Sequence, residues 1–285
     1  MLSEPATERE LAIGTQMLPP MQRASGEGRL SVSSAGGQTR VRDLFQQGCA
    51  KMRLPRATTD RHGREVVLIN SSGGVTGGDH LQWSLDVGEG AMLTATTQAC
   101  EKIYRSNGDD GVTDINIRVR KNASMAWLPQ ETILFDEARL RRTINVDLDA
   151  TSRFLMVEAV LFGRQAMAEA VTDGRLLDRW RIRQGGRLVH AEQMHLFGDI
   201  HAQMAVPAIG NDNLAFATIM LIASEAEGLL EPLRRVIGPN GAVSYVNSKL
   251  IARLVAPDGY TLRRTLVPVI ELAHHGGTVP KVWMI

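Results

Sequence analysis

The chain of 285 residues has few cysteines, few aromatic residues and almost no net charge. Cys49 and Cys100 are its only thiols, and their spacing excludes a disulfide framework and a CxxC zinc knuckle, which favours a reducing compartment. The 32 basic and 31 acidic residues give a formal charge of +1, so no global field favours nucleic acid or an anionic membrane as a partner. Recognition by this protein must therefore be local.

Long hydrophobic runs are also missing. The amino terminus carries Glu4, Glu8, Arg9 and Glu10 where a signal peptide would have an apolar core. The longest apolar run, residues 214–223, is much shorter than the roughly 20 residues that span a bilayer. The sequence therefore predicts a soluble, cytoplasmic protein.

Short alternating segments separated by polar turns dominate the chain from Gly28 onward, and they predict a mainly β fold. We expect residues 1–27 to be a flexible lead-in and residues 28–285 to form a single β-rich domain. The expected structure is a series of antiparallel hairpins stacked as two packed sheets. The hairpins are 80–87 with 91–98, 112–120 with 124–127, 143–148 with 153–161, and 179–183 with 187–193.

The turns of these hairpins recur at intervals of roughly 30 residues, a rhythm that is too loose to predict a solenoid or a propeller. Each strand alternates apolar and polar residues, so each sheet is expected to bury one face. Two such sheets can cover one another.

Two α-helices are expected near the carboxyl end. A strand at 213–223 is followed by Ser224-Glu-Ala-Glu227, a capping box that predicts the start of the first helix, and Gly238-Pro239 predicts its end. A strand at 242–255 comes next. The second helix is expected from Asp258 to His275, kinked or divided at Pro268. Its apolar stripe consists of Leu262, Leu266, Ile270 and Ala273.

Four glycines lie within the segment Asn70-Ser-Ser-Gly-Gly-Val-Thr-Gly-Gly-Asp79. A phosphate loop would continue into Lys-Ser/Thr and a helix, whereas here an acidic residue precedes a strand pattern. The segment therefore predicts a tight turn or bulge between strands 66–70 and 80–87. Its glycines also indicate that the backbone packs closely against a neighbouring group there.

Catalytic motifs are missing from the sequence: it has no GxSxG nucleophile elbow, no HExxH and no kinase or β-lactamase motif set. Several carboxylates nevertheless lie in or beside segments that read as buried, and a buried carboxylate needs a cation, a hydrogen-bond network or a metal. One interpretation is pairing with Lys102, Arg105 or Arg164. The other is a set of oxygen ligands along a wet interior route for a divalent ion, where binding by carboxylates alone would be weak and exchangeable. The candidates are Asp79, Glu131, Asp136, Glu158 and Glu169.

Six blocks in series resemble the UreD family of urease accessory proteins, also called UreH. The blocks are residues 70–79, Thr96-Thr-Gln-Ala, Lys102-Ile-Tyr-Arg-Ser, Trp127-Leu-Pro-Gln-Glu-Thr-Ile-Leu-Phe, Gly163-Arg164 with Glu169, and Pro280-Lys-Val-Trp. By this resemblance, structural or interaction roles fall on Gly73, Gly74, Gly77, Gly78, Thr97, Gln98, Lys102, Tyr104, Arg105, Pro129, Arg164 and Trp283. The sequence departs from the family pattern at Cys100-Glu101, Ala168 and Lys281.

The resemblance implies a non-enzymatic maturation factor with a mainly β fold and two helices. Such a protein binds apo-urease and joins UreF and the GTPase UreG to deliver nickel to the urease active site, with UreE as an upstream carrier. Nickel would be in transit through an internal passage, lined by the candidate carboxylates, and not a tightly bound cofactor. A homodimer within the complex is compatible with this role.

Two other function classes stay open from the residues alone. A hydrolase could use an Asp/Glu pair in a β-sandwich cleft, because two carboxylates in different environments can act as acid and base. A carbohydrate-binding module is the other alternative, although four Trp and three Tyr offer few stacking platforms.

Overall fold

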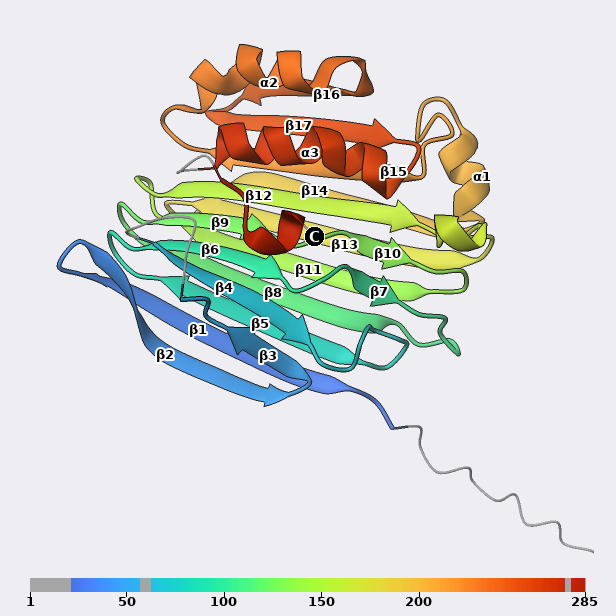
Figure 1. Cartoon of the computed structure of the whole chain (residues 1–285), viewed down its shortest axis with the longest axis horizontal. Coiled ribbons are helices and arrows are strands. Elements are labelled where there is room, and N and C mark those ends of the chain that lie inside the picture. Colours follow the sequence, from blue (N-terminus) through green and yellow to red (C-terminus); the bar gives the residue numbers. More distant parts are fainter. Residues whose placement is uncertain (1–21, 57–62, 275–277, 285) are drawn as a thin grey trace, which may run out of the picture.

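The computed structural model of the chain describes residues 22–56, 63–274 and 278–284. In this part the chain forms two β-sheets and three α-helices (Figure 1). Two of these helices, α2 (Leu230–Ile237) and α3 (Gly259–Ala273), pack against the ten-stranded sheet and form a second hydrophobic core with it. The predicted mainly β architecture of two packed sheets is confirmed. Among the described residues, no helix combines the length and apolar character needed to cross a membrane.

The seven-stranded sheet contains, in spatial order, β14 (Arg187–Gly198), β13 (Gly174–Gln184), β11 (Arg139–Leu148), β8 (Gly111–Val119), β5 (His80–Val87), β1 (Ser25–Ala35) and β2 (Gln38–Gly48). The ten-stranded sheet contains β16 (Gly241–Val246), β17 (Lys249–Ala256), β15 (Ala215–Ile222), β12 (Arg153–Phe162), β9 (Ser124–Leu128), β6 (Met92–Thr97), β4 (Arg64–Asn70) and β3 (Ala50–Arg53). Two short strands, β7 (Glu101–Ile103) and β10 (Thr132–Leu134), pair with each other, and β10 also pairs with β12.

The first three predicted hairpins are wrong in their pairing, because their two strands lie in different sheets. β5 pairs in parallel with β1 and β8, whereas β6 pairs in parallel with β4 and β9. A turn that crosses to the opposite sheet buries the same apolar face as a hairpin turn, so alternation along the strand does not distinguish them. The fourth hairpin is confirmed, since β13 and β14 are antiparallel.

The chain therefore winds between the sheets, and each coil stacks on the one before. Successive turns are joined by hydrogen bonds, from the Gly90 N–H to the Lys121 carbonyl (3.0 Å) and from the Asn122 N–H to Thr151 Oγ1 (3.0 Å). The rhythm of roughly 30 residues is the length of one coil. Figure 1 shows this order as a progression from β1 and β2 at one end of the stack to α2 (Leu230–Ile237) and α3 (Gly259–Ala273) at the other.

The core between the sheets is filled by the inward-facing residues of both. Gly28 of β1 lies beside Trp83 of β5 in the parallel register, and a Cβ at position 28 would lie 2.6 Å from a ring atom of Trp83. The missing side chain at Gly28 thus leaves the space that the indole fills.

The carboxyl-terminal third matches the prediction in part. β15 is the expected strand, and α3 begins as expected after Asp258, whose carboxylate accepts from the Thr261 N–H (2.6 Å). Pro268 does not divide α3, because the helix packs through a continuous buried stripe. The expected end of this helix at His275 lies outside the described residues.

Four details of the prediction are wrong. The strand expected at 242–255 is a hairpin of β16 and β17, whose turn residues Asn247 and Ser248 take positive φ angles of 48° and 59°. Ser224 does not cap a helix: a 3₁₀ turn, η2 (Ala226–Leu229), precedes α2. A third helix, α1 (Ile200–Ala205), was not expected. β1 begins at Ser25, inside the expected lead-in, of which residues 1–21 lie outside the described part.

The remaining short helices are all 3₁₀ turns. They are η1 (Gln165–Met167), η3 (Gly238–Asn240) and η4 (Lys281–Met284).

Candidate functional site

Four of the six sequence blocks come together at one end of the coils. We call residues 70–79, 100–106, 129–136 and 163–169 the motif layer. Its segments are joined in order by backbone hydrogen bonds, from Val75 N–H to the Lys102 carbonyl (2.8 Å), from Phe135 N–H to the Ile103 carbonyl (3.1 Å) and from Gly163 N–H to the Leu134 carbonyl (2.8 Å). Segments far apart in the sequence therefore form one continuous surface.

The glycine segment of the motif layer needs its glycines for two reasons. Gly73 and Gly78 have positive φ angles of 84° and 85°, which side chains rarely adopt. At Gly74 and Gly77 a Cβ would lie 2.3 Å and 2.1 Å from neighbouring side chains. The prediction of a tight turn with a close approach, between β4 and β5, is confirmed.

The two aspartates among the candidates hold loops in place. Asp79 accepts from the Ala24 N–H through Oδ1 (2.7 Å) and from a second backbone N–H, three residues earlier, through Oδ2. Asp136 accepts from the Thr172 N–H (2.7 Å) and the Asp173 N–H (3.1 Å). Partial burial acts to raise the pKa of Asp136, but these N–H donors outweigh it and the pKa is lowered. Both aspartates are therefore bound by backbone N–H donors.

Glu131 is buried beneath α3 and pairs with Arg263. The guanidinium donates to both carboxylate oxygens, with Nε to Oε1 at 3.0 Å and Nη2 to Oε2 at 2.5 Å, and the Cys100 thiol donates to Oε2 (3.3 Å). Arg263 also lies over the ring of Trp283, whose indole N–H donates to the Leu128 carbonyl (3.1 Å). The end of the chain thus closes over this part of the motif layer.

Two hollows share Cys100, the neighbour of Glu131, as a lining residue. One, of about 220 Å³, is lined by Asn70, Gln98 and Lys102 among others, and the second, of about 550 Å³, is lined by Glu131 and Arg263 among others. Burial, followed by the neighbouring Glu131, raises the pKa of the Cys100 thiol to about 12, so the sulfur is a protonated donor and not a thiolate.

Glu158 lies in a different place, between the two sheets. Its carboxylate and that of Asp178 each lie 2.5 Å from a terminal nitrogen of Arg142, and each is 3% exposed. The indole N–H of Trp127 donates to Glu158 (2.7 Å), and that of Trp180 donates to Asp178 (2.9 Å). Burial raises the pKa of Glu158. Sequence reasoning missed Arg142 and Asp178.

Glu169 pairs with Arg164, one of the three cations predicted as partners. Two hydrogen bonds join them, Nε to Oε2 at 2.9 Å and Nη2 to Oε1 at 2.6 Å, and the guanidinium lies over the ring of Phe135. The Arg164 hydrogen bonds lower the pKa of Glu169. Arg105 pairs instead with Glu137 (3.0 Å), and in the described part Lys102 forms no ion pair with a candidate carboxylate.

The other block residues connect the strands of the motif layer. Thr97 Oγ1 accepts from the Gln130 N–H (2.9 Å), and the Gln98 carbonyl accepts from the Gln130 side chain (2.9 Å), on either side of the loop that contains Pro129. The Tyr104 hydroxyl donates to the Gly73 carbonyl (3.2 Å). These contacts fix the shape of the layer.

The five candidate carboxylates do not form one cluster. Within the residues that the structure describes, no group of three or more His, Cys, Asp or Glu side chains could hold a metal ion. Each candidate already has an arginine or backbone N–H partner. A role for them along a metal route stays a prediction.

Comparison with known proteins gives the family. The family described as "UreD urease accessory protein" matches residues 24–284. This chain belongs to the UreD family. A relative from Agrobacterium fabrum, named Urease accessory protein UreD, is 48% identical over 262 residues, which cover 92% of each chain. Relatives with the same name from Chelativorans sp. and Brucella suis are 47% and 44% identical over 270 residues, covering 93% of this chain and 96% of theirs. The resemblance seen in the six blocks is confirmed.

One departure from the UreD pattern has a visible backbone consequence. Ala168 ends η1 with a φ of 52°, a left-handed conformation that glycine adopts more readily than alanine. The left-handed conformation of an alanine costs about 1 kcal/mol of conformational free energy. The turn that carries Glu169 is therefore retained.

A second departure from the UreD pattern, Glu101, predicts a pH effect on stability. Burial raises the pKa of Glu101 to about 7, although the Asn70 side chain donates to it (3.1 Å) and acts in the opposite direction. The folded state therefore binds the proton of the Glu101 carboxyl group more tightly than the unfolded state does. The stabilising contribution of protonated Glu101 is lost as the pH rises through about 7. We expect Glu101→Gln to raise the free energy of unfolding by about 1–2 kcal/mol at about pH 8 and to have little effect at about pH 5.

Thermal unfolding of the wild type and the variant at both pH values measures this effect. Glu89→Gln, at an exposed turn position, is the matched control and is expected to leave the pH dependence unchanged. Equal pH dependence of the wild type and Glu101→Gln would contradict the prediction.

Proposed function

We propose that this protein is a non-enzymatic nickel-insertion chaperone for urease. It binds apo-urease and, together with UreF and the GTPase UreG, delivers nickel to the urease active site, with UreE as the upstream carrier. The step takes place in the cytoplasm, where Cys49 and Cys100 stay reduced. Membership of the UreD family across nearly the whole described chain is the observation that carries this proposal.

The proposed route for nickel runs through the two hollows that Cys100 lines. Glu131 is the carboxylate that a cation would encounter there. Because Glu131 is already neutralised by Arg263, a divalent ion would have to displace the guanidinium, which keeps binding weak. Weak, exchangeable oxygen ligation suits transit better than storage. Nickel is therefore cargo in this proposal and not a resident cofactor.

In this proposal, one sheet face docks on immature urease. UreF binds the end formed by α2, α3 and the adjoining strands, and a homodimer forms only within the complex. Exposed apolar side chains at that end, such as Tyr260 and Leu272, support a partner there.

No observation favours the hydrolase alternative. Such an enzyme needs two carboxylates in an open cleft, and in the described part the pair that shares one cation, Glu158 and Asp178, is closed to solvent. The carbohydrate-binding alternative likewise finds no row of exposed aromatic side chains among the described residues.

Replacing Glu131 by Gln or Glu169 by Ala is expected to lower the nickel content of urease on the order of tenfold. Glu131 lines the larger hollow, and Glu169 holds Arg164, which lines the same hollow. Complex formation with UreF and apo-urease should be retained. The measurement is metal analysis of urease purified after co-expression with each variant, together with a pull-down of the complex. Glu192→Gln, which removes another ion pair, that with Arg253 (2.9 Å), is the matched control. Full nickel loading with both Glu131→Gln and Glu169→Ala would place the route elsewhere.

A further inference from the structure

We propose that the outer face of β11, β13 and β14 docks a protein partner through carboxylates on the partner's surface. We call this surface the arginine face. It consists of Arg139, Arg141, Arg175, Arg179, Arg181 and Arg183, bordered by Phe197 and Leu188. The inference rests on the proposed function, in which that partner is apo-urease, and it assigns the sheet face that makes the contact.

Strand alternation gathers the arginines on one side. In β13, four arginines at positions 175, 179, 181 and 183 point away from the core, while Leu176, Trp180 and Ile182 on the other side are buried. In β11, Arg139 and Arg141 lie on the same outer side, and Arg141 neighbours Leu177 of β13 in the parallel register. Adjacent strands thus place six cationic side chains on one surface.

Three of these arginines have local partners. Arg175 pairs with Asp110 (3.4 Å), Arg139 pairs with Asp173 (3.7 Å), and Arg181 donates to the Trp180 and Glu192 carbonyls (2.7 and 3.2 Å). The first two pairs are long and exposed at the surface, so they contribute little to stability.

The other three, Arg141, Arg179 and Arg183, are exposed, and in the described part of the chain no carboxylate pairs with them. Asp147 neighbours Arg183 in the register but forms no ion pair with it. In a chain whose formal charge is only +1, this accumulation is a local positive surface. It fits a surface of opposite charge.

The composition of the face favours a protein over a polyphosphate. Phe197 of β14 is 69% exposed and lies opposite Arg175, so its ring projects on the same side, next to the ring of His195. Leu188, at the other end of β14, is 53% exposed. Arginine and aromatic residues are enriched at protein interfaces, where the guanidinium binds carboxylates through two hydrogen bonds. Nucleic acid would gain little from these apolar borders.

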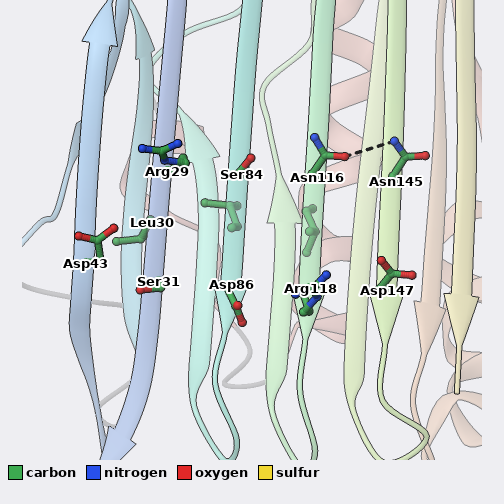
Figure 2. Close-up of a pocket in the computed structure, with 12 residues that line it drawn as sticks. Arg29, Leu30, Ser31, Asp43, Ser84, Asp86, Asn116, Arg118, Asn145 and Asp147 are labelled. Carbon is green, nitrogen blue, oxygen red and sulfur yellow. Dashed lines mark hydrogen bonds between the residues drawn. The ribbon is translucent and has the colours of Figure 1, made fainter. Parts of the chain in front are cut away.

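A shallow trough of about 470 Å³ continues the face across β8, β5 and β1 (Figure 2). It is lined by the short polar side chains of Asn145, Asn116 and Ser84, and Asn145 donates to Asn116 (3.3 Å). Asn145 neighbours Arg181 in the register, which makes the trough continuous with the arginine face. Charged side chains of both signs also line the trough, from Arg29, Arg118 and several aspartates, so a protein surface with both signs of charge could fit there.

The test is a double charge reversal, Arg179→Glu with Arg183→Glu, in the full chain. Both side chains are exposed, so the fold is expected to be retained, and thermal unfolding checks it. We expect the dissociation constant for apo-urease to rise on the order of 100-fold, mainly through a slower association rate, and its dependence on salt to weaken. The neutral pair Arg179→Gln with Arg183→Gln should weaken binding by about tenfold. Binding of UreF should be unchanged.

The matched control is Arg40→Glu with Arg42→Glu, on the exposed edge strand β2 of the same sheet, which is expected to change the dissociation constant less than about twofold. If the wild type binds apo-urease and the Arg179/Arg183 reversal binds it equally well, the inference is overturned while the proposed function stands. Wild-type protein that fails to bind apo-urease overturns both. Duplex DNA bound as tightly as apo-urease, or a wild-type dimer that the reversal dissociates, would assign the face to another occupant and overturn the inference.

Discussion

Replacing Arg142 by Met is expected to lower the free energy of unfolding by about 4 kcal/mol at neutral pH. Arg142 lies between Glu158 and Asp178, and both carboxylates are almost fully buried. Removing the guanidinium leaves two negative charges without a cation in a medium that solvates them poorly. The indole N–H donors of Trp127 and Trp180 satisfy one oxygen of each carboxylate but cannot neutralise the charge.

The effect of Arg142→Met should depend on pH. Burial already raises the pKa of Glu158, and loss of the cation acts in the same direction. The variant is therefore expected to regain stability relative to the wild type as the pH falls and to lose it as the pH rises. Chemical denaturation at about pH 5 and about pH 8 measures the difference. The exposed neighbour Arg141→Met is the control and should change stability by less than about 0.5 kcal/mol.

A triple variant, Arg142→Met with Glu158→Gln and Asp178→Asn, separates charge from packing. It should recover most of the lost stability, because the carboxylates it replaces are then neutral hydrogen-bonding groups. Unfolding of Arg142→Met at the same denaturant concentration as the wild type at about pH 8 would show that the cluster carries no such energy.

Replacing Trp283 by Ala is expected to cost about 3–5 kcal/mol, the second large effect. The indole is buried near the end of the chain, donates to the Leu128 carbonyl and lies beneath Arg263. Its loss would leave a cavity against the ten-stranded sheet and remove the support that orients Arg263 toward Glu131. Trp283→Phe keeps most of the volume and should cost about half as much.

The neighbouring position provides a control for Trp283→Ala, since Met284 is 70% exposed and Met284→Ala should be nearly neutral. Thermal unfolding measures all three variants. A Trp283→Ala protein as stable as Met284→Ala would mean that the last turn, η4, is not anchored by the indole.

Local features of the fold could be predicted from the sequence because short-range physics decides them. The glycine segment at 70–79 and the cap at Asp258 follow from backbone preferences of the residues themselves. Strand positions such as β5 and β15 follow from alternation or from an unbroken apolar run. These predictions needed no knowledge of the partner strand.

Long-range pairing could not be predicted in the same way. The turn after β5 reads as a hairpin turn, yet the chain crosses there to the other sheet, and the deciding interactions are hydrogen bonds to turns roughly 30 residues away. The helix α1 could not be predicted, because six residues are too few to show a helical hydrophobic period. In both cases the deciding contact is tertiary.

For the candidate site too, the sequence predicted local features but not long-range contacts. The sequence identified Glu131, Glu158 and Glu169 as carboxylates in buried surroundings, and the structure gives each an arginine partner. Of these arginines only Arg164, the partner of Glu169, was among the predicted cations, whereas Arg263 lies 132 residues from Glu131 and was not. Burial patterns thus identified the carboxylates but not the arginines that pair with them across the fold.

The fit of Gly28 against Trp83 bears on how the stack of coils is kept in alignment. A slip of one residue between β1 and β5 would bring Glu27 or Arg29 against the indole of Trp83. The fit of a glycine, which has no side chain, against this large ring therefore fixes the alignment of the first coil. Among distant relatives, a bulkier residue at position 28 should be accompanied by a smaller one at position 83. The two positions are therefore expected to covary, as a single steric unit shared by two strands.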